Sequence, residues 1–382
     1  MSDVAIIFCG SYDEAEVLSA VERGVSLLGG AEKFVQPGEK ILLKLNWLTG
    51  DPPEKCVTTH PAVFRAVARV FQKTGAILSY GDSPGFQSPE SVAKRTGCAE
   101  VAKEMNLPLA DFRAGREAHY PEGKQNKKFT IANAVLDSDG VISLPKMKTH
   151  AFQRVTGAVK NQFGCVPGAL KGEFHVKVPD AYDFAKMLID LNSFVHPRLY
   201  IMDGIMAMEG NGPRGGDPRK MDVLLLSADP IALDATMCRL MQLDPALVLT
   251  NRTGQEMGAG TYLAENIRLL GDPIEPFIAK DYVVNRKQEQ ETPKKAQPAF
   301  LKNAITPRPY IMAERCVRCG ICVKMCPVTP KAVNWHDGNK KNPPSYQYER
   351  CIRCYCCQEL CPERAIQIKV PLLRRILDGK KS

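Results

Sequence analysis

Nine of the 14 cysteines lie in one stretch near the C-terminal end of the chain, between Cys316 and Cys361. The stretch holds two similar runs, CVRCGICVKMCP and CIRCYCCQELCP. In each run three cysteines are separated by two residues, a fourth follows after three more, and a proline comes next. Thiolates on tight Cys-x-x-Cys loops are soft ligands, and bacterial proteins bind [4Fe–4S] clusters with this spacing. The sequence therefore predicts two [4Fe–4S] clusters.

The fourth cysteine of each run decides how the ligands are shared. In ferredoxins with two clusters, this cysteine binds the cluster of the other run. We predict a first cluster site of Cys316, Cys319, Cys322 and Cys361, and a second cluster site of Cys351, Cys354, Cys357 and Cys326. Cys356 interrupts the second run and has no ligand position, so we predict a packed thiol there.

Two other chemistries use closely spaced cysteines. Zinc knuckles need four ligands per site, usually from two separated pairs, whereas these runs hold three evenly spaced cysteines and a Cys-Pro. A disulfide framework is typical of small secreted domains, and this is a chain of 382 residues without an export signal at its start. Iron–sulfur ligation is therefore the favoured interpretation.

Composition and charge limit the class of protein. Hydrophobic residues make up 44% of the chain, and no apolar run approaches the ~18 residues of a membrane span. The first residues lack the basic region of an export signal, so we expect a cytoplasmic protein. The net charge is +9, and residues 310–370 contain ten Lys or Arg against five Asp or Glu.

The basic excess in residues 310–370 favours an acidic redox partner, because opposite charges steer association over a long range. A solvated surface is the alternative explanation for these charges. Nucleic acid is not an expected partner, since the basic residues do not alternate with aromatic residues that could stack on bases.

The rest of the chain alternates between strand and helix patterns. We expect strands at 4–8, 41–45, 76–80, 140–144, 199–202 and 223–226, and helices at 13–28, 61–73, 181–194 and 230–242. Strands joined by helical crossovers predict an α/β fold with a mainly parallel sheet and flanking helices, followed by a small C-terminal ferredoxin-like α+β domain. The predicted parts are an α/β domain (1–278), a linker (279–309), a cluster domain (310–370) and a basic tail (371–382). The tail has the pattern of a short amphipathic helix, which caps the cluster domain or contacts a membrane.

Five polar motifs follow directly on predicted strands, where the loops of a parallel sheet line a ligand crevice. Lysines dominate them, which suits a carboxylate or phosphate ligand. Catalytic candidates are Lys146, Lys148, His150, Asp82 and Glu209; ligand-binding candidates are Lys44, Asn46, His60, Ser83, Lys160, Asn161 and Asn211; further polar groups are Lys55, His175 and Asp203. The alternative is that the carboxylates only pair with the lysines.

Motifs for common cofactors are weak or missing. Residues 210–215 match GxGxxG formally, but a strand follows and not a helix, which argues against a dinucleotide site. No Walker motif occurs, and no motif supports a flavin. Cys56 and Cys165 lie in loops near His60 and Lys160, which leaves an additional metal site open, although no close pair of ligands exists in the sequence.

Six segments together resemble one known family. They are KCVTTHPAVFRA, YGDSPG, LPKMKTHAF, GAVKNQFGCVPG, DGIMAMEGNGP and DPIALDA, and their order over Val4 to Gly271 is similar to that of the family called domain of unknown function 362. The C-terminal part separately resembles bacterial 2[4Fe–4S] ferredoxins, as in many members of that family. The resemblance implies the architecture and the cluster ligands, and it names no reaction.

These observations favour an iron–sulfur oxidoreductase, in which electrons pass between the clusters and an anionic small molecule at the sheet edge. A second hypothesis is a non-catalytic electron carrier whose large domain docks a partner enzyme. A third is a redox adaptor that binds a ligand and senses redox state.

Overall fold

The computed structural model describes residues 1–168, 170–287, 303–336 and 338–374. The chain divides into two compact units. The α/β unit comprises Met1–Lys171 and Asp180–Arg286, and the cluster unit comprises Gly172–Pro179 and Lys287–Ser382. Residues 288–302 of the predicted linker and residues 375–382 of the predicted tail lie outside the described residues.

The α/β unit is built on one large, mainly parallel sheet, as predicted. Its strands are β1 (Ser2–Phe8), β2 (Lys40–Lys44), β3 (Ile77–Gly81), β6 (Gly140–Ser143), β9 (Leu199–Glu209), β10 (Asp217–Ser227) and β11 (Ile267–Gly271), in the order β11-β1-β10-β9-β6-β2-β3. Strand β7 (Lys146–His150) continues beside β9 after β6 ends, and β8 (Arg154–Thr156) pairs with β7.

Strand β10 interrupts the parallel arrangement within the order β11-β1-β10-β9-β6-β2-β3. It runs antiparallel to both of its neighbours, β1 and β9. The reason is local, because β9 and β10 are joined by a short turn and not by a helical crossover. Two antiparallel steps restore the direction, so β1 and β9 run the same way and their carboxyl ends lie at the same edge.

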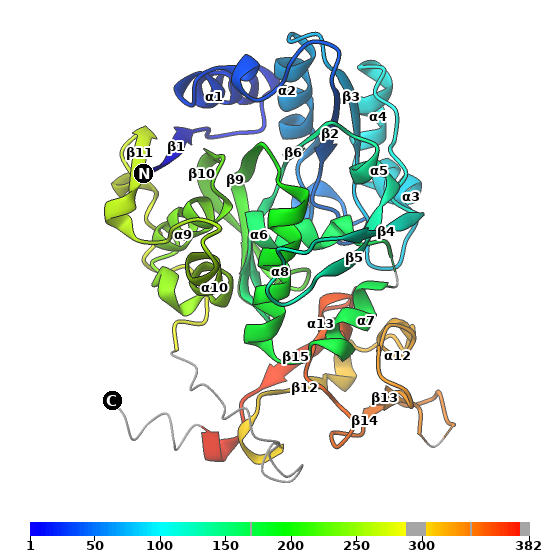
Figure 1. The fold of residues 1–382 in the computed structure, drawn as a ribbon. Helices are drawn as coiled ribbons and strands as arrows, with labels where there is room; N and C mark the ends of the chain where they lie inside the picture. Colours follow the sequence, from blue (N-terminus) through cyan, green and yellow to red (C-terminus); the bar gives the residue numbers. More distant parts are fainter. Residues whose placement is uncertain (169, 288–302, 337, 375–382) are drawn as a thin grey trace. The chain divides into compact units, whose positions relative to one another are not determined.

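Helices cover both faces of the sheet (Figure 1). On one face, α1 (Glu14–Leu27) and α2 (Pro61–Gln72) pack against strand residues such as Ile7 and Leu226. On the other, α9 (Pro230–Leu240) packs against Ile6 and Leu225. Neighbouring residues of one strand thus enter opposite cores, as the two-residue period of a strand requires.

Caps in the sequence set the beginnings of these helices. The Asp13 carboxylate accepts from the backbone N–H groups of Ala15 and Glu16 at the start of α1. The Asp229 carboxylate does the same for Ile231 and Ala232 at the start of α9, and α2 begins with a proline. Short side-chain acceptors and a first-turn proline are favoured at these positions, which explains why the helix predictions were close.

Several elements were not predicted. They are the hairpin of β4 (Gly115–His119) and β5 (Lys128–Ala132), strands β7 and β8, and the helices α3 (Pro89–Arg95), α4 (Cys98–Glu104), α5 (Asn133–Leu136), α6 (Ala158–Asn161) and α10 (Leu249–Met257). Most are shorter than the window over which periodicity can be read. Helix α8 (Ala181–Val195) matches its prediction closely.

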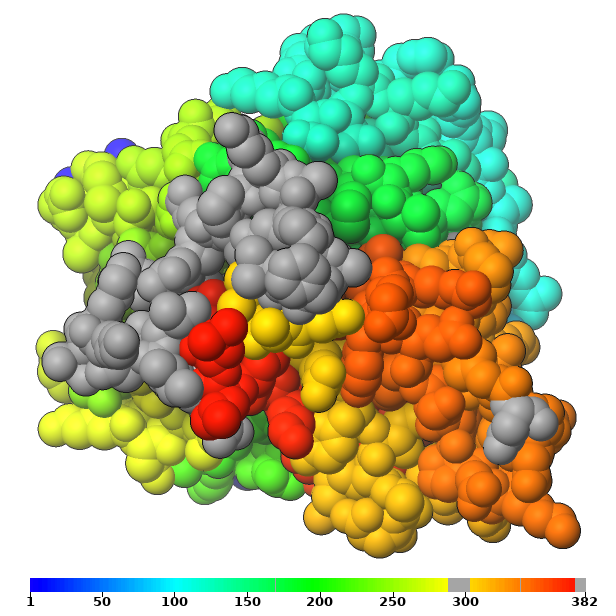
Figure 2. All heavy atoms as spheres, turned by 90° about the horizontal axis from the view of Figure 1, so that it is seen from below, coloured from blue at the N-terminus to red at the C-terminus, as the bar shows by residue number. Residues whose placement is uncertain are grey.

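The cluster unit consists of short elements around the cysteine runs. Strand β12 (Arg308–Ile311) pairs with β15 (Ile366–Lys369), and the two lie side by side in yellow-orange and red in Figure 2. Strand β13 (Val333–Asn334) pairs with β14 (Ser345–Tyr346). Helix α12 (Ile321–Lys324) follows the first loop and α13 (Cys356–Glu359) the second.

The described part of α7 (Leu170–Lys177) begins at the boundary between the units. Among the helices that the structure describes, none is both long and apolar enough to cross a membrane.

Candidate functional site

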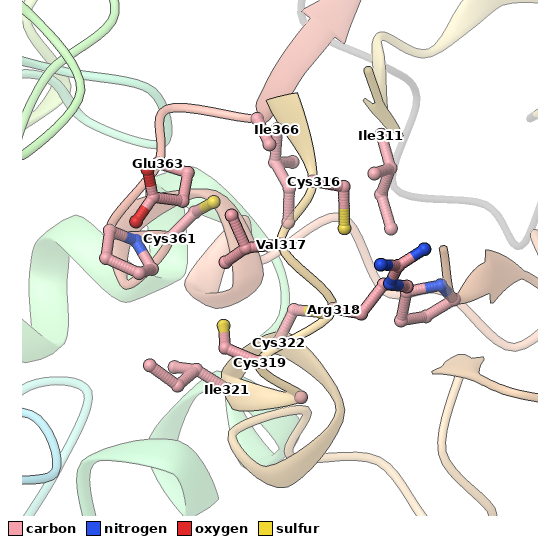
Figure 3. A pocket seen from close by; sticks show the side chains of 14 residues that line it. Ile311, Cys316, Val317, Arg318, Cys319, Ile321, Cys322, Cys361, Glu363 and Ile366 are labelled. Carbon is pink, nitrogen blue, oxygen red and sulfur yellow. The ribbon is translucent and has the colours of Figure 1, made fainter. Parts of the chain in front are cut away.

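Four of the nine clustered cysteines line one pocket of the cluster unit. They are Cys316, Cys319, Cys322 and Cys361, the predicted first cluster site. Figure 3 shows the sulfur atoms of Cys316 and Cys361 facing the same space, with isoleucine side chains beside them. The pocket therefore brings three thiols of the first run together with the last thiol of the second.

A second pocket holds the other predicted set. Cys326, Cys351, Cys354 and Cys357 line it together with Tyr346 and apolar residues. Cys326 comes from the first run and the other three thiols come from the second, so the two pockets exchange one cysteine each. Cys356 lines neither pocket and is buried at the first position of α13.

Left-handed backbone conformations shape both cysteine loops. Arg318 and Gly320 flank Cys319 with φ of 58° and 75°, and Arg353 and Tyr355 flank Cys354 with φ of 65° and 61°. A residue other than glycine costs about 1–2 kcal/mol in this region. Arg318, Arg353 and Tyr355 are not glycine and therefore carry this cost. The left-handed residues tighten each loop, so that its successive thiols face the same pocket.

The chemistry of the pockets fits [4Fe–4S] clusters. Each supplies four thiol ligands in an apolar lining, which is what such a cluster takes from a protein. Within the described ranges, no three side chains of His, Cys, Asp or Glu converge closely enough to hold a single metal ion. The thiols surround a volume and do not meet at a point.

In the α/β unit, Lys44 and Asp82 form a buried ion pair at the ends of β2 and β3. The Lys44 Nζ lies 2.9 Å from Asp82 Oδ1 and donates to Asn161 Oδ1 at 3.2 Å. Asp82 also accepts from the backbone N–H of Trp47. Gly164 covers the pair, since a Cβ there would lie 1.9 Å from Asp82 Oδ1. The pair is enclosed and internally satisfied.

A second buried pair joins β7 to β9. The Lys146 Nζ lies 2.7 Å from Asp203 Oδ2, as expected from the strand register that places the two residues opposite each other. Tyr12 completes a triangle, because its Oη donates to Asp203 Oδ1 and accepts from Lys146, both at 2.9 Å. The backbone N–H of Met206 also donates to the Tyr12 Oη. Burial, and then the Asp203 charge, raises the pKa of Tyr12 well above its ordinary value, so the phenol keeps its proton.

His60 is partly exposed and contacts Tyr12 and Asp203 of this network. Its ring stacks on Tyr12 with centroids 3.5 Å apart, and its backbone N–H donates to Asp203. The Nδ1 atom accepts from the backbone N–H of Ala62, so the neutral ring carries its proton on Nε2. Burial lowers the pKa of His60 to about 4, and the neighbouring Lys146 acts in the same direction. His60 is therefore a neutral N–H donor near pH 7.

Two further candidates are buried near these pairs. The Lys148 ammonium donates to the Val57 carbonyl at 2.6 Å, and the His150 Nδ1 accepts from the backbone N–H groups of Phe152 and Gln153. Asn46 Oδ1 and Thr58 Oγ1 are buried and have no hydrogen-bond partner among the described residues. The sheet edge thus offers two polar atoms that a ligand or water can satisfy.

Other predicted residues serve different contacts. The Glu209 carboxylate accepts from the backbone N–H of Val283, and Lys55 lies half-exposed beside Asp51. Lys160 lies over the ring of Phe163. His175 belongs to the cluster unit and not to the α/β unit.

Two remaining ligand-binding candidates, Ser83 and Asn211, lie in different loops. The Ser83 hydroxyl accepts from the backbone N–H of Gly168, and Asn211 lies in the turn between β9 and β10.

Cys56 and Cys165 are the two cysteines beside which the sequence left an additional metal site open. Burial raises the pKa of the Cys165 thiol to about 12, and burial also raises the pKa of Cys56. No group of metal-binding side chains in the described ranges includes either residue.

Sequence reasoning missed Tyr12 and Lys171. Tyr12 follows β1, so the rule that polar residues gather after strands applied to it, but its segment CGSY contains no charged residue. Lys171 donates to the carbonyls of Ser83 and Val166. No sequence signal distinguishes Lys171 from a surface lysine.

Two solved structures align with parts of this chain at low similarity. The apoprotein of lactate racemase from Thermoanaerobacterium thermosaccharolyticum aligns with 61% of this chain and 56% of its own, at 11% identity and a TM-score of 0.39. A protein from Thermotoga maritima aligns with 57% of this chain and 56% of its own, at 10% identity and a TM-score of 0.33. The chain thus spans little more than half the length of either structure.

Sequence relatives are much closer. The thylakoid-associated protein sll1697 of Synechocystis sp. is 38% identical over 279 residues, which cover 73% of this chain and 86% of that protein. Residues 308–362 match the 4Fe-4S dicluster domain, which supports the assignment of this chain as an iron–sulfur electron-transfer protein. Residues 41–239 match the family described as domain of unknown function DUF362. The chain belongs to the DUF362 family and joins its α/β domain to a 4Fe-4S dicluster domain.

Proposed function

We propose that this protein is an iron–sulfur oxidoreductase that passes electrons between a partner protein and an anionic small molecule bound by the α/β unit. The observation that carries the proposal is the pair of pockets with four cysteines each. Bound there, the two clusters would supply single electrons. Because the pockets exchange one cysteine each, the two clusters share their supporting loops.

The residues of the α/β unit would hold the ligand and move protons. The proposed ligand-binding groups include two hydrogen-bond donors, the Nε2–H of His60 and the Lys148 ammonium. Asn46 Oδ1 can accept and the Thr58 hydroxyl can donate or accept, and neither oxygen has a partner among the described residues. Tyr12, Lys146 and Asp203 form a continuous set of hydrogen bonds directly beneath His60, along which a proton can move. Among the original catalytic candidates, Lys146 and Lys148 are therefore preferred to Glu209, which is bonded to the backbone of Val283.

A second candidate function is a non-catalytic electron carrier or redox adaptor. One observation favours it: Lys44 and Lys146, two of the cations expected to attract an anion, each have a buried carboxylate partner. A buried pair of this kind is a structural element in many proteins. In that case the α/β unit would bind a partner enzyme and would not turn over a substrate.

The proposed protein partner is acidic, because residues 310–370 carry twice as many basic as acidic residues. We propose a cytoplasmic location. The Synechocystis relative is named for its association with thylakoids, so an association of this chain with a membrane surface is the competing location.

Metal analysis of anaerobically prepared protein tests the first part of the proposal. We expect about eight iron and eight sulfide per chain, and EPR signals of two [4Fe–4S] clusters after reduction. About four iron per chain, or stoichiometric zinc, would contradict the assignment. Mass spectrometry of small molecules released from the same preparation then identifies a ligand.

Substitution of Lys148 tests the second part. Lys148→Met keeps most of the apolar stem and removes the charge, and a charged hydrogen bond contributes about 1.5–3 kcal/mol. We expect Lys148→Met to bind the copurified ligand about 10- to 100-fold more weakly and to retain both clusters. Lys94→Met, at an exposed position of α3, is the matched control and should bind normally. Unchanged ligand binding in Lys148→Met would favour the carrier function.

A further inference from the structure

Tyr346 touches one of the cysteines of the second cluster site. It lies at the end of β14, and its Oη donates a hydrogen bond to the Sγ of Cys357 at 3.2 Å. Both residues line the second pocket. A hydroxyl in this position would bond directly to a cluster ligand, and not to a group farther from the iron.

The position of the Tyr346 ring is fixed on several sides. The backbone of Tyr346 pairs with Val333 in the neighbouring strand. Its ring stacks on Tyr348 with centroids 5.5 Å apart and an angle of 10° between the planes. Tyr348 is held in turn, because its Oη donates to the Pro309 carbonyl and the Arg308 guanidinium lies 4.6 Å from its ring centroid. The hydroxyl of Tyr346 is therefore aimed by packing.

The first cluster site differs in this respect. Among the described residues, no side-chain hydroxyl donates to Cys316, Cys319, Cys322 or Cys361. The two runs are nearly the same in spacing, so this hydroxyl makes the two sites different in chemistry.

We propose that Tyr346 tunes the second cluster and raises its reduction potential. The inference rests on the cluster ligands assigned above. Reduction adds negative charge to the cluster and to its thiolates, and a hydrogen bond to sulfur stabilises that charge. The donor therefore favours the reduced state of the second cluster and leaves the first unaffected.

Other charges also act on the second site, in both directions. The Lys331 ammonium donates to the Cys326 carbonyl, and the Arg353 guanidinium donates to the Cys351 carbonyl at 3.3 Å. Both cations favour the reduced state. The buried Glu359, close enough to influence Cys354, opposes them. These groups are the same in a variant that lacks only the Tyr346 hydroxyl, so such a variant isolates the hydrogen bond.

Potentiometric titration of Tyr346→Phe, followed by EPR on the anaerobic full-length protein, tests the proposal. We expect one of the two cluster signals to shift to a more negative midpoint, by more than the spread of replicate titrations, with the other signal and the iron content unchanged. Tyr348→Phe is the matched control, since it removes a neighbouring hydroxyl whose one hydrogen bond within the described ranges is to the Pro309 carbonyl. Both of its midpoints should equal those of the wild type.

Unchanged midpoints in Tyr346→Phe at full iron content, or an equal shift in Tyr348→Phe, would overturn the proposal. If Tyr346→Phe does not retain iron, Tyr346→Leu replaces it with the same expectation, and loss of iron from both variants would show a structural role instead. A wild-type preparation without two clusters would refute the proposed function itself, and the iron measurement distinguishes that failure from the others.

Discussion

Removal of the Tyr12 hydroxyl tests whether the Lys146–Asp203 network depends on the residue that sequence reasoning missed. In Tyr12→Phe the ring still stacks on His60, but three hydrogen bonds are lost. Asp203 keeps two donors, the Lys146 ammonium and the His60 backbone N–H. The Met206 N–H loses its hydrogen bond to the Tyr12 oxygen.

The expected cost follows from these contacts. An unsatisfied buried donor costs about 1–3 kcal/mol, and the charged partners are not left bare. We therefore expect Tyr12→Phe to lower the free energy of unfolding by about 2 kcal/mol. Tyr120→Phe is the control, because the Tyr120 hydroxyl makes no hydrogen bond within the described part of the chain. This variant should change the stability by less than about 0.5 kcal/mol.

Urea unfolding at pH 8 measures the difference. Far-UV circular dichroism follows the folded chain, while visible absorbance of the same sample follows the clusters, since a protein of two units need not unfold in one step. The midpoint for secondary structure should fall in Tyr12→Phe without early loss of cluster absorbance. Equal midpoints for Tyr12→Phe and Tyr120→Phe would refute the view that this hydroxyl supports the sheet edge.

Three further predictions concern single residues. The pKa of His60 falls from an ordinary 6.5 to about 4 on folding, so its contribution to stability is complete above pH 6.5 and is lost as the pH falls toward 4. His60→Gln should flatten the pH dependence of the urea midpoint in that window. Gly164→Ala should destabilise the α/β unit by at least ~2 kcal/mol in the same assay, because its Cβ would collide with the Lys44–Asp82 pair. Cys356→Ser should keep both EPR signals, and loss of one signal would mean that Cys356 is a ligand and Cys357 is not.

Features that depend on residues close together in the chain could be predicted from the sequence. The cysteine spacing identified all eight cysteines that line the two pockets, because neighbouring cysteines of a run are separated by only two or three residues. Helices such as α2 and α8 were found from their periodicity and from caps within a few residues of their ends. Each of these features depends on neighbours in the chain.

The partners of the sheet-edge lysines could not be predicted, because they depend on strand order. Lys146 meets Asp203 since β7 lies beside β9, and Lys44 meets Asp82 since β2 lies beside β3. The antiparallel strand β10 brings β1 into the same direction as β9, and with it Tyr12 to the same edge. Hydrophobic patterns predict that strands exist, and they do not rank the possible neighbours.

The two ion pairs explain how this edge can hold charge in a buried place. Each lysine and its carboxylate come from different strands or from the loop that follows one, so each pair links two neighbouring strands. Removing one partner would leave a buried charge uncompensated, which costs more than the pair contributes. A ligand bound at this edge, as proposed above, would therefore meet a preformed frame of balanced charges. Its affinity would come from groups outside the two ion pairs, and the proposed ones are His60 Nε2, the Lys148 ammonium, Asn46 Oδ1 and Thr58 Oγ1.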